Sequence, residues 1–121
     1  MTDDRVVPGS GPDVEPISDL TLTDVLGAAA EGLAGVSVDD DGALTTWSAG
    51  GRPFAHLAAA SAEFHLDPAV ARAALRTPDT SPSGRGLGWV AFTPDVLDDA
   101  AVDRAEAWFL SAHRQATRAG A

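Results

Sequence analysis

Two long stretches of the chain carry apolar residues at helical spacing. Over residues 22–34 the apolar positions recur every three or four residues, which predicts a helix with one apolar face. The same spacing predicts a closing helix from Asp98 or Asp99, either of which would cap it, to about Thr117. A shorter predicted helix, residues 67–75, begins with an Asp-Pro pair, in which the aspartate caps the helix and the proline takes its first position. The chain therefore contains three predicted helices.

The segments between these helices alternate apolar with polar residues, which is typical of β-strands with one buried face. An Asp-Gly turn joins the first two strands into a hairpin, and a weaker Ala-rich turn joins the next two. A fifth strand over 88–93 follows a loop, residues 76–87, that is rich in Pro, Gly and Ser. The first four strands are predicted at 36–38, 44–47, 52–57 and 62–66.

The order of these elements predicts the fold class. Helices flank strands that come mostly in hairpins, in the order α-β-β-β-β-α-β-α. This order predicts an α+β domain of two layers, in which an antiparallel sheet of about five strands has its helices packed on one face. The opposite face of the sheet is then open to solvent or to a partner.

Length and local composition predict how the chain is organised. Its 121 residues correspond to one domain, since domains usually have about 100–150 residues. Residues 1–17 combine Pro, Gly and acidic residues with few apolar ones, which is typical of disorder. We therefore expect a disordered acidic tail over 1–17 and a single domain over 18–118.

The chain is strongly acidic. It has 18 Asp and Glu against 8 basic residues, all of them Arg, and a formal net charge of −10. This charge repels nucleic acid and anionic membranes, so neither is an expected partner. The absence of Cys excludes disulfides, thiolate nucleophiles and zinc fingers. Since no apolar run approaches the roughly 20 residues of a membrane span and the first residues are polar, we expect a soluble, cytoplasmic protein.

Three segments carry a resemblance to known families: Gly51–Leu57, the helix at 68–75 and Gly88–Phe92. With them, the chain from about residue 36 to 115 resembles a bacterial family of luciferase-domain proteins, whose members share a G-x-x-x-x-H strand, a G-W-V-x-F strand and a closing amphipathic helix. It is also similar to the YjbR (MmcQ-like) family, which has a CyaY-like α+β fold. The tyrosine-bearing helix motif of that family is missing, because Trp108-Phe109 stands in its place. The resemblance implies the fold and no particular activity.

The predicted hairpin over 52–66 holds a candidate metal site. If its register pairs His56 with Glu63 and Phe54 with His65, both imidazoles and the carboxylate lie on one face of the sheet. Two imidazoles and a carboxylate are ligands for Zn, Mn or Fe, or serve acid–base chemistry. The alternative interpretation is a polar, solvated face opposite an apolar core face. A register slip of one residue would separate the three side chains.

The predicted loop 76–87 and two tryptophans are candidates for ligand binding. Arg76 and Arg85 flank a segment rich in Pro, Ser and Thr, where guanidinium groups and backbone amides would hold a carboxylate or phosphate. Trp47 and Trp89 would form a ligand or partner patch if they lie on the open face of the sheet. The alternatives are that Arg76 caps the second helix, that the loop merely crosses the sheet, and that the tryptophans fill the core.

These patterns favour a binding or protein-interaction module over an enzyme. We expect it to use the open sheet face and the 76–87 loop, with a protein or a small anionic ligand as partner. The residues do not identify a cofactor. One alternative is a small-ligand or metal-binding, enzyme-like site on the 52–66 hairpin. A second alternative is an acidic partner of a basic protein, whose binding salt would weaken over a screening length of about 8–10 Å.

Overall fold

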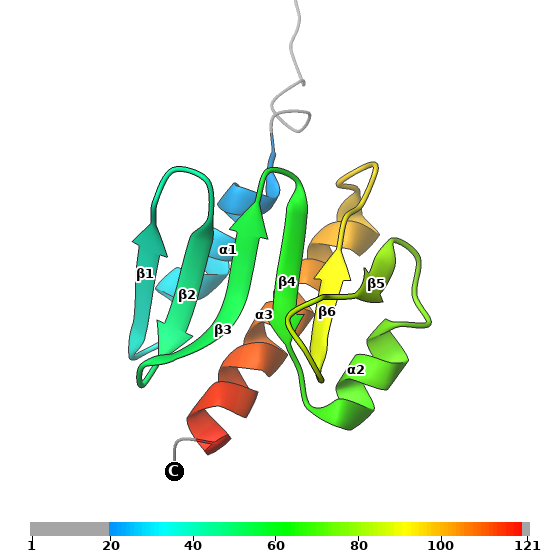
Figure 1. Ribbon diagram of the computed structural model, residues 1–121. Coiled ribbons are helices and arrows are strands. Elements are labelled where there is room, and N and C mark those ends of the chain that lie inside the picture. The colour runs from blue at the N-terminus through cyan, green and yellow to red at the C-terminus, as the bar shows by residue number, and fades with distance from the viewer. Residues whose placement is uncertain (1–19, 120–121) are drawn as a thin grey trace, which may run out of the picture.

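Six antiparallel strands form one open sheet in the computed structural model, which describes residues 20–119 (Figure 1). Their spatial order is β1-β2-β3-β4-β6-β5. The strands are β1 (Val36–Asp40), β2 (Thr45–Ala49), β3 (Arg52–Ala58), β4 (Ser61–His65), β5 (Thr80–Pro82) and β6 (Trp89–Phe92). The helices are α1 (Leu22–Glu31), α2 (Pro68–Ala74) and α3 (Asp99–Ala119). The expected tail, residues 1–17, lies outside the described residues.

The predicted fold class is confirmed, with one strand more than expected. The observed order is α-β-β-β-β-α-β-β-α, because residues 80–82 of the expected loop form β5. This strand is too short and polar to show alternation, and it is held by pairing Ser81 with Ala91 of β6. Asp79, with a φ of 67°, turns the chain into it. The expectation of a loop over the whole of 76–87 was therefore wrong.

The helices begin where the sequence places their caps. The Thr21 hydroxyl accepts a hydrogen bond from the backbone N–H of Asp24, and the Thr21 backbone N–H donates to the Asp24 carboxylate, which forms a capping box. The carboxylate of Asp67 accepts from the second residue of α2, and that of Asp98 accepts from Ala101 in the first turn of α3. Helix α1 ends at Gly32, earlier than the predicted 34, because glycine is a poor helix former. Within residues 20–119 no helix combines the length and the apolar character needed to cross a membrane.

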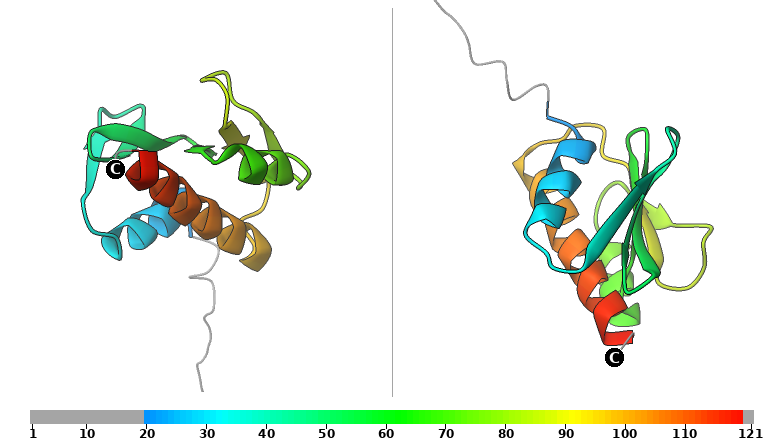
Figure 2. Two further views of the ribbon diagram at one scale, coloured as in Figure 1. Left: turned by 90° about the horizontal axis from the view of Figure 1, so that it is seen from below. Right: turned by 90° about the vertical axis from the view of Figure 1, so that its left-hand side faces the viewer.

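Helices α1 and α3 pack on one face of the sheet, as predicted, and α2 lies beside the lower end of β6 (Figures 1 and 2). The loop between β5 and β6 crosses the opposite face, which we refer to as the open face. The core lies between the sheet and the two helices. Its largest fully buried side chains are Phe54, Phe64, Phe92, Phe109, Leu26, Leu66 and Val90.

A β-bulge in β3 decides which side chains reach the open face. Trp47 pairs with Ala55, but the next residue of β2 pairs with Pro53, so Phe54 has no partner on β2. Phe54 packs instead against Phe109 of α3, with ring centroids 5.2 Å apart. The predicted pairing of Phe54 with His65 was therefore wrong, since the β3–β4 ladder ends at Ala55.

Candidate functional site

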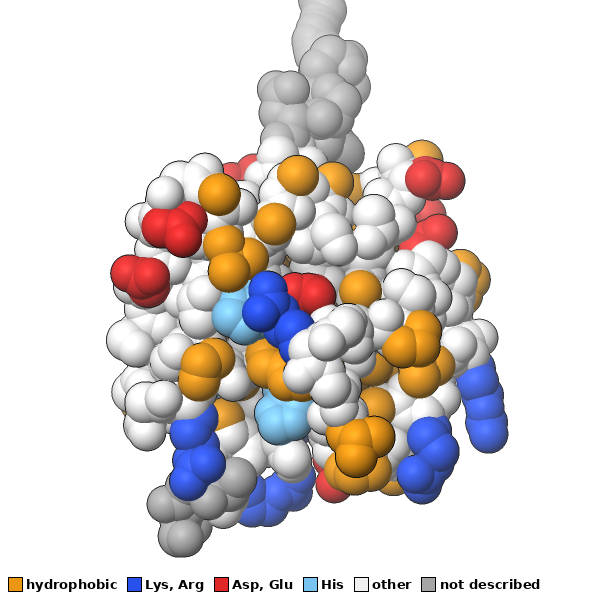
Figure 3. Space-filling model, viewed as in Figure 1, with side chains coloured by type: hydrophobic (Ala, Val, Ile, Leu, Met, Phe, Trp, Pro, Cys, Tyr) orange, Lys and Arg blue, Asp and Glu red, His pale blue; other side chains and the backbone are white. Residues whose placement is uncertain are grey.

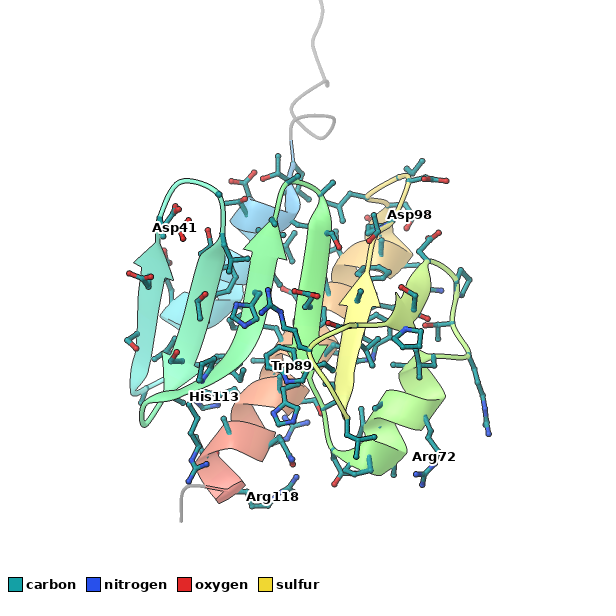
Figure 4. The ribbon with its side chains drawn as sticks, viewed as in Figure 1. Asp41, Arg72, Trp89, Asp98, His113 and Arg118 are labelled. Carbon is teal, nitrogen blue, oxygen red and sulfur yellow. The ribbon has the colours of Figure 1, made fainter. Side chains whose placement is uncertain are left out.

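A cluster of polar and aromatic side chains occupies the centre of the open face, where Figure 4 shows Trp89 in front of the sheet. The ladder pairs His56 with Glu63 across β3 and β4, and His65 with Trp89 across β4 and β6. Because residues 63 and 65 of one strand point to the same face, the predicted shared face of His56, Glu63 and His65 is confirmed. A two-residue turn at 59–60 sets this register between β3 and β4, and Ala59 in the turn has a φ of 53°.

The Trp89 indole is stacked on two imidazoles. Its ring centroid lies 5.0 Å from that of His65, with planes 10° apart, and 5.1 Å from that of His56, with planes 27° apart. The Arg85 guanidinium carbon lies 6.0 Å from the indole centroid, at the limit of a cation–π contact. His56 is only 8% exposed, and its Nδ1 shares a hydrogen bond of 2.9 Å with the Thr46 hydroxyl. The stack therefore fixes the orientation of both rings.

Glu63 ties the β5–β6 loop to the sheet. The hydroxyl of Ser83 donates to Oε2 and Nε of Arg85 donates to Oε1, both at 2.6 Å. Burial raises the pKa of the Glu63 carboxyl, but the Ser83 and Arg85 hydrogen bonds outweigh it, so the pKa lies below its ordinary value of 4.5. The carboxylate is thus charged at neutral pH and already satisfied by two donors from the loop.

The pKa of His56 is also lowered. Burial of the ring is the main cause and the nearby Arg85 charge adds to it, while Glu63 acts in the opposite direction. Since the ordinary value is 6.5, His56 is neutral at pH 7. His56 therefore adds no positive charge to the open face at this pH.

The metal site predicted from His56, Glu63 and His65 gains no support from the described residues. Within 20–119 no three His, Cys, Asp or Glu side chains lie close enough together to hold a metal ion. The shared face is real, but Trp89 stacks on both imidazoles and Glu63 is bound to Ser83 and Arg85. The Glu63 carboxylate would have to leave these two donors to bind a metal ion.

The four candidate ligand-binding residues separate into two groups. Arg85 and Trp89 belong to the cluster on the open face. Trp47 does not, since it is 3% exposed on the helix-covered face and lies edge-on to Phe109 at 5.3 Å. Arg76 is exposed just after α2. The expectation of an open-face patch containing Trp47 was therefore wrong, because packing of α3 takes this side chain into the core.

A hollow of about 430 Å³ opens beside the stacked rings. Figure 3 shows two His surfaces with hydrophobic surface between them at the centre of the open face, next to Arg side chains. We refer to the cavity as the His–Trp hollow. It is lined by Gly51, Arg52, Pro53, His56, His65, Arg85, Trp89, Gln115 and Ala116.

Sequence reasoning missed three residues of this region. Arg52 stands beside the Gly50-Gly51 turn of the hairpin that carries His56, and this proximity was a usable signal. Ser83 precedes Arg85 by two residues, the spacing at which extended side chains share a face. Gln115 had no local signal, because it reaches the hollow only where the end of α3 passes the lower edge of the sheet (Figure 1).

The contacts of Glu63 predict a pH-dependent stability. We expect Glu63→Gln to lower the free energy of unfolding at pH 7 by about 1–2 kcal/mol, because it removes charge-assisted hydrogen bonds. A carboxylate with a lowered pKa stabilises the fold above its unfolded pKa, and this contribution disappears as the pH falls through the folded pKa. The gap between wild type and variant should therefore narrow below about pH 4.5. Urea unfolding from pH 3 to 8 measures this difference in the free energy of unfolding. A difference that stays constant over that range would contradict the stabilising role of the Glu63 carboxylate.

Comparison of the chain with protein-family models, with curated proteins and with solved structures gave no match. The resemblance to luciferase-domain and YjbR-like families therefore stays a prediction.

Proposed function

We propose that this domain is a binding module whose His–Trp hollow takes a small organic anion. The observation that carries the proposal is the charge of the lining. In a chain with a formal net charge of −10, the hollow is lined by two Arg and two His side chains and by no Asp or Glu. Such a concentration of donors without carboxylates favours a carboxylate or phosphate ligand.

The two arginines are suited to different roles. Arg85 is held by Nε against Glu63, which leaves its two Nη groups outside that contact and in a fixed position. Arg52 is an exposed side chain at the start of β3, so it adds charge at the rim. A pre-positioned guanidinium and a mobile one together would orient an anion while limiting the entropy that binding costs.

The distribution of charge over the molecule also supports an anionic ligand. Figure 4 places Asp41 and Asp98 at one end of the sheet and Arg72 and Arg118 at the opposite end. The hollow lies toward the Arg-bearing end, since it is lined by Arg52 from the start of β3 and by Gln115 from near the end of α3 (Figure 1). An approaching anion is therefore repelled from one end and attracted to the other.

The alternative of a metal-dependent or enzyme-like site on the 52–66 hairpin has weaker support. Glu63 is engaged by Ser83 and Arg85, and the two imidazoles are engaged by Trp89. The hydroxyls of Thr46 and Ser83 are hydrogen-bonded to His56 and Glu63, but neither hydroxyl-bearing residue lines the His–Trp hollow. We therefore retain binding, rather than catalysis, as the function that the geometry supports.

A titration of the full chain with butanoate, benzoate and phenyl phosphate tests the proposal. We expect at least one of them to bind and to shift the NMR resonances of the Trp89 indole N–H and of Arg85 Nε. Arg52→Gln should raise the Kd by about five- to tenfold, since it removes a charged hydrogen-bond donor. Arg76→Gln is the matched control, because it removes the same charge from a residue that does not line the hollow. Equal losses in both variants, or no binding by wild type, would refute the proposal.

A further inference from the structure

We infer that the anion taken by the His–Trp hollow carries an apolar chain, so that the ligand is a single-chain amphiphile such as a medium-chain carboxylate. This inference rests on the proposed function and adds the class of ligand. It comes from a second hollow that adjoins the first, which we refer to as the Leu87 hollow. Its volume is about 290 Å³.

The two hollows share part of their walls. His65 and Gln115 line both of them, so one ligand would pass from one hollow to the other along these side chains. The Leu87 hollow is mainly apolar; Arg72 is the one Arg that lines it, and no Asp or Glu does. Its apolar lining comes from Leu66, Pro68, Ala71, Leu75 and Leu87.

Two leucines that line the Leu87 hollow are exposed to solvent, which indicates an apolar surface that is incompletely covered. Leu87 is 97% exposed at the end of the β5–β6 loop, and Leu75 is 39% exposed at the end of α2. A leucine this exposed next to a concave apolar wall gains burial only when an apolar group lies between them. The loop that carries Leu87 is fixed to the sheet through Glu63, so the wall is pre-positioned rather than formed on binding.

The arrangement of charge orients such a ligand. Two arginines, Arg52 and Arg85, line the His–Trp hollow, whereas the Leu87 hollow has one, Arg72, beside its five apolar residues. The imidazoles already occupy the stacking surface of the indole, so the apolar part of a ligand contacts the Leu87 hollow rather than the face of Trp89. A carboxylate at one end and a flexible chain at the other match this order of surfaces.

Chain length is the variable that tests the inference. Butanoate, hexanoate and octanoate, all below the concentrations at which they form micelles, would be titrated into the full chain and followed by NMR. Burial of each added methylene should tighten binding by about twofold or more, so octanoate should bind at least about tenfold more tightly than butanoate. Leu87→Ser should raise the Kd of octanoate by about fivefold or more and leave that of butanoate unchanged.

The controls separate this inference from the proposed function. Val96→Ser removes an exposed apolar side chain, 68% exposed, that lines neither hollow, and should leave both affinities unchanged. If butanoate and octanoate bind equally, the inference falls and the proposed function stands. If neither binds, the inference falls, and the proposed function falls with it when benzoate and phenyl phosphate also fail to bind. Equal binding of octyltrimethylammonium would overturn the role of the negative charge, and sedimentation with phosphatidylglycerol vesicles without octanoate binding would assign the wall to a lipid surface instead.

Discussion

Replacement of Phe109 by alanine is expected to cause the largest loss of stability of any change considered for this domain. Phe109 is fully buried, and its ring lies edge-on to Trp47 at 5.3 Å and to Phe54 at 5.2 Å. It thus joins α3 to both β2 and the bulge of β3. Phe→Ala changes in a core cost about 3–5 kcal/mol, a large part of the 5–15 kcal/mol that stabilises a typical domain. Thermal unfolding should show a Tm lowered by more than about 12 °C.

The matched control for this change is Leu87→Ala. It also removes a large apolar side chain, but one that is 97% exposed, so its effect on the free energy of unfolding should stay within about 0.5 kcal/mol. If Phe109→Ala unfolds as readily as wild type, the packing of α3 against the bulge is wrong. The position of Phe54, and with it the alternation that brings His56 to the open face, would then have to be revised.

Gly88→Ala is expected to be the second most damaging change, and it acts directly on the site. Gly88 has a φ of 82°, and a Cβ at this position would lie 2.7 Å from the backbone oxygen of Leu66. The Leu66 N–H also donates to the Gly88 carbonyl at 2.8 Å, so the two segments cannot easily separate. A left-handed conformation costs a non-glycine residue about 1–3 kcal/mol, and the backbone clash adds to it. We expect a loss of about 3 kcal/mol or more in urea unfolding.

Two other glycines of the same loop separate the causes of this loss. Gly84→Ala meets no atom within 4 Å and has no left-handed φ, so it should be nearly neutral. Gly86→Ala also meets no atom within 4 Å but has a φ of 128°, so it isolates the conformational cost and should give an intermediate loss. A Gly88→Ala protein as stable as the Gly84→Ala protein would show that Gly88 and Leu66 do not lie as close as described.

These two positions explain how the open face acquires its shape. Phe109 holds the bulge from the helix side, and Gly88 lets β6 start so close to β4 that Trp89 lies against His65. The stacked rings and the position of the β5–β6 loop are therefore consequences of the geometry at two points that do not line the His–Trp hollow. The candidate site depends on these points for its order, although Phe109 lines neither hollow and Gly88 lines only the Leu87 hollow.

A substantial part of the site was predictable from local pattern. His56, Glu63 and His65 share a face because side chains alternate along a strand and because the turn at 59–60 is short enough to set the register. Alternation along 88–93 likewise separates Trp89 from Val90. The prediction of a metal centre did not follow, because a shared face specifies which side chains are neighbours and not where each is aimed.

The positions that sequence reasoning missed are set by contacts between distant segments. Ser83 contacts Glu63, which lies 20 positions earlier in the chain, and Gln115 comes from near the end of the last helix. The alternation of side chains along β2 places Trp47 on one face of the sheet, but alternation alone does not show which face the helices cover. Once α3 packs, Trp47 lies in the core and Trp89 on the open face.

Local sequence patterns are enough to predict the α+β class, the three helices with their caps, and the hairpin that brings two histidines and a glutamate together. These features depend on spacing, on turn residues and on capping side chains, all of which act within a few residues. The bulge at Phe54, the short strand β5, the loop that binds Glu63 and the two adjoining hollows depend instead on tertiary packing. Each of these features is set by the close packing of segments that lie far apart in the chain, and a local sequence pattern carries no information about that packing.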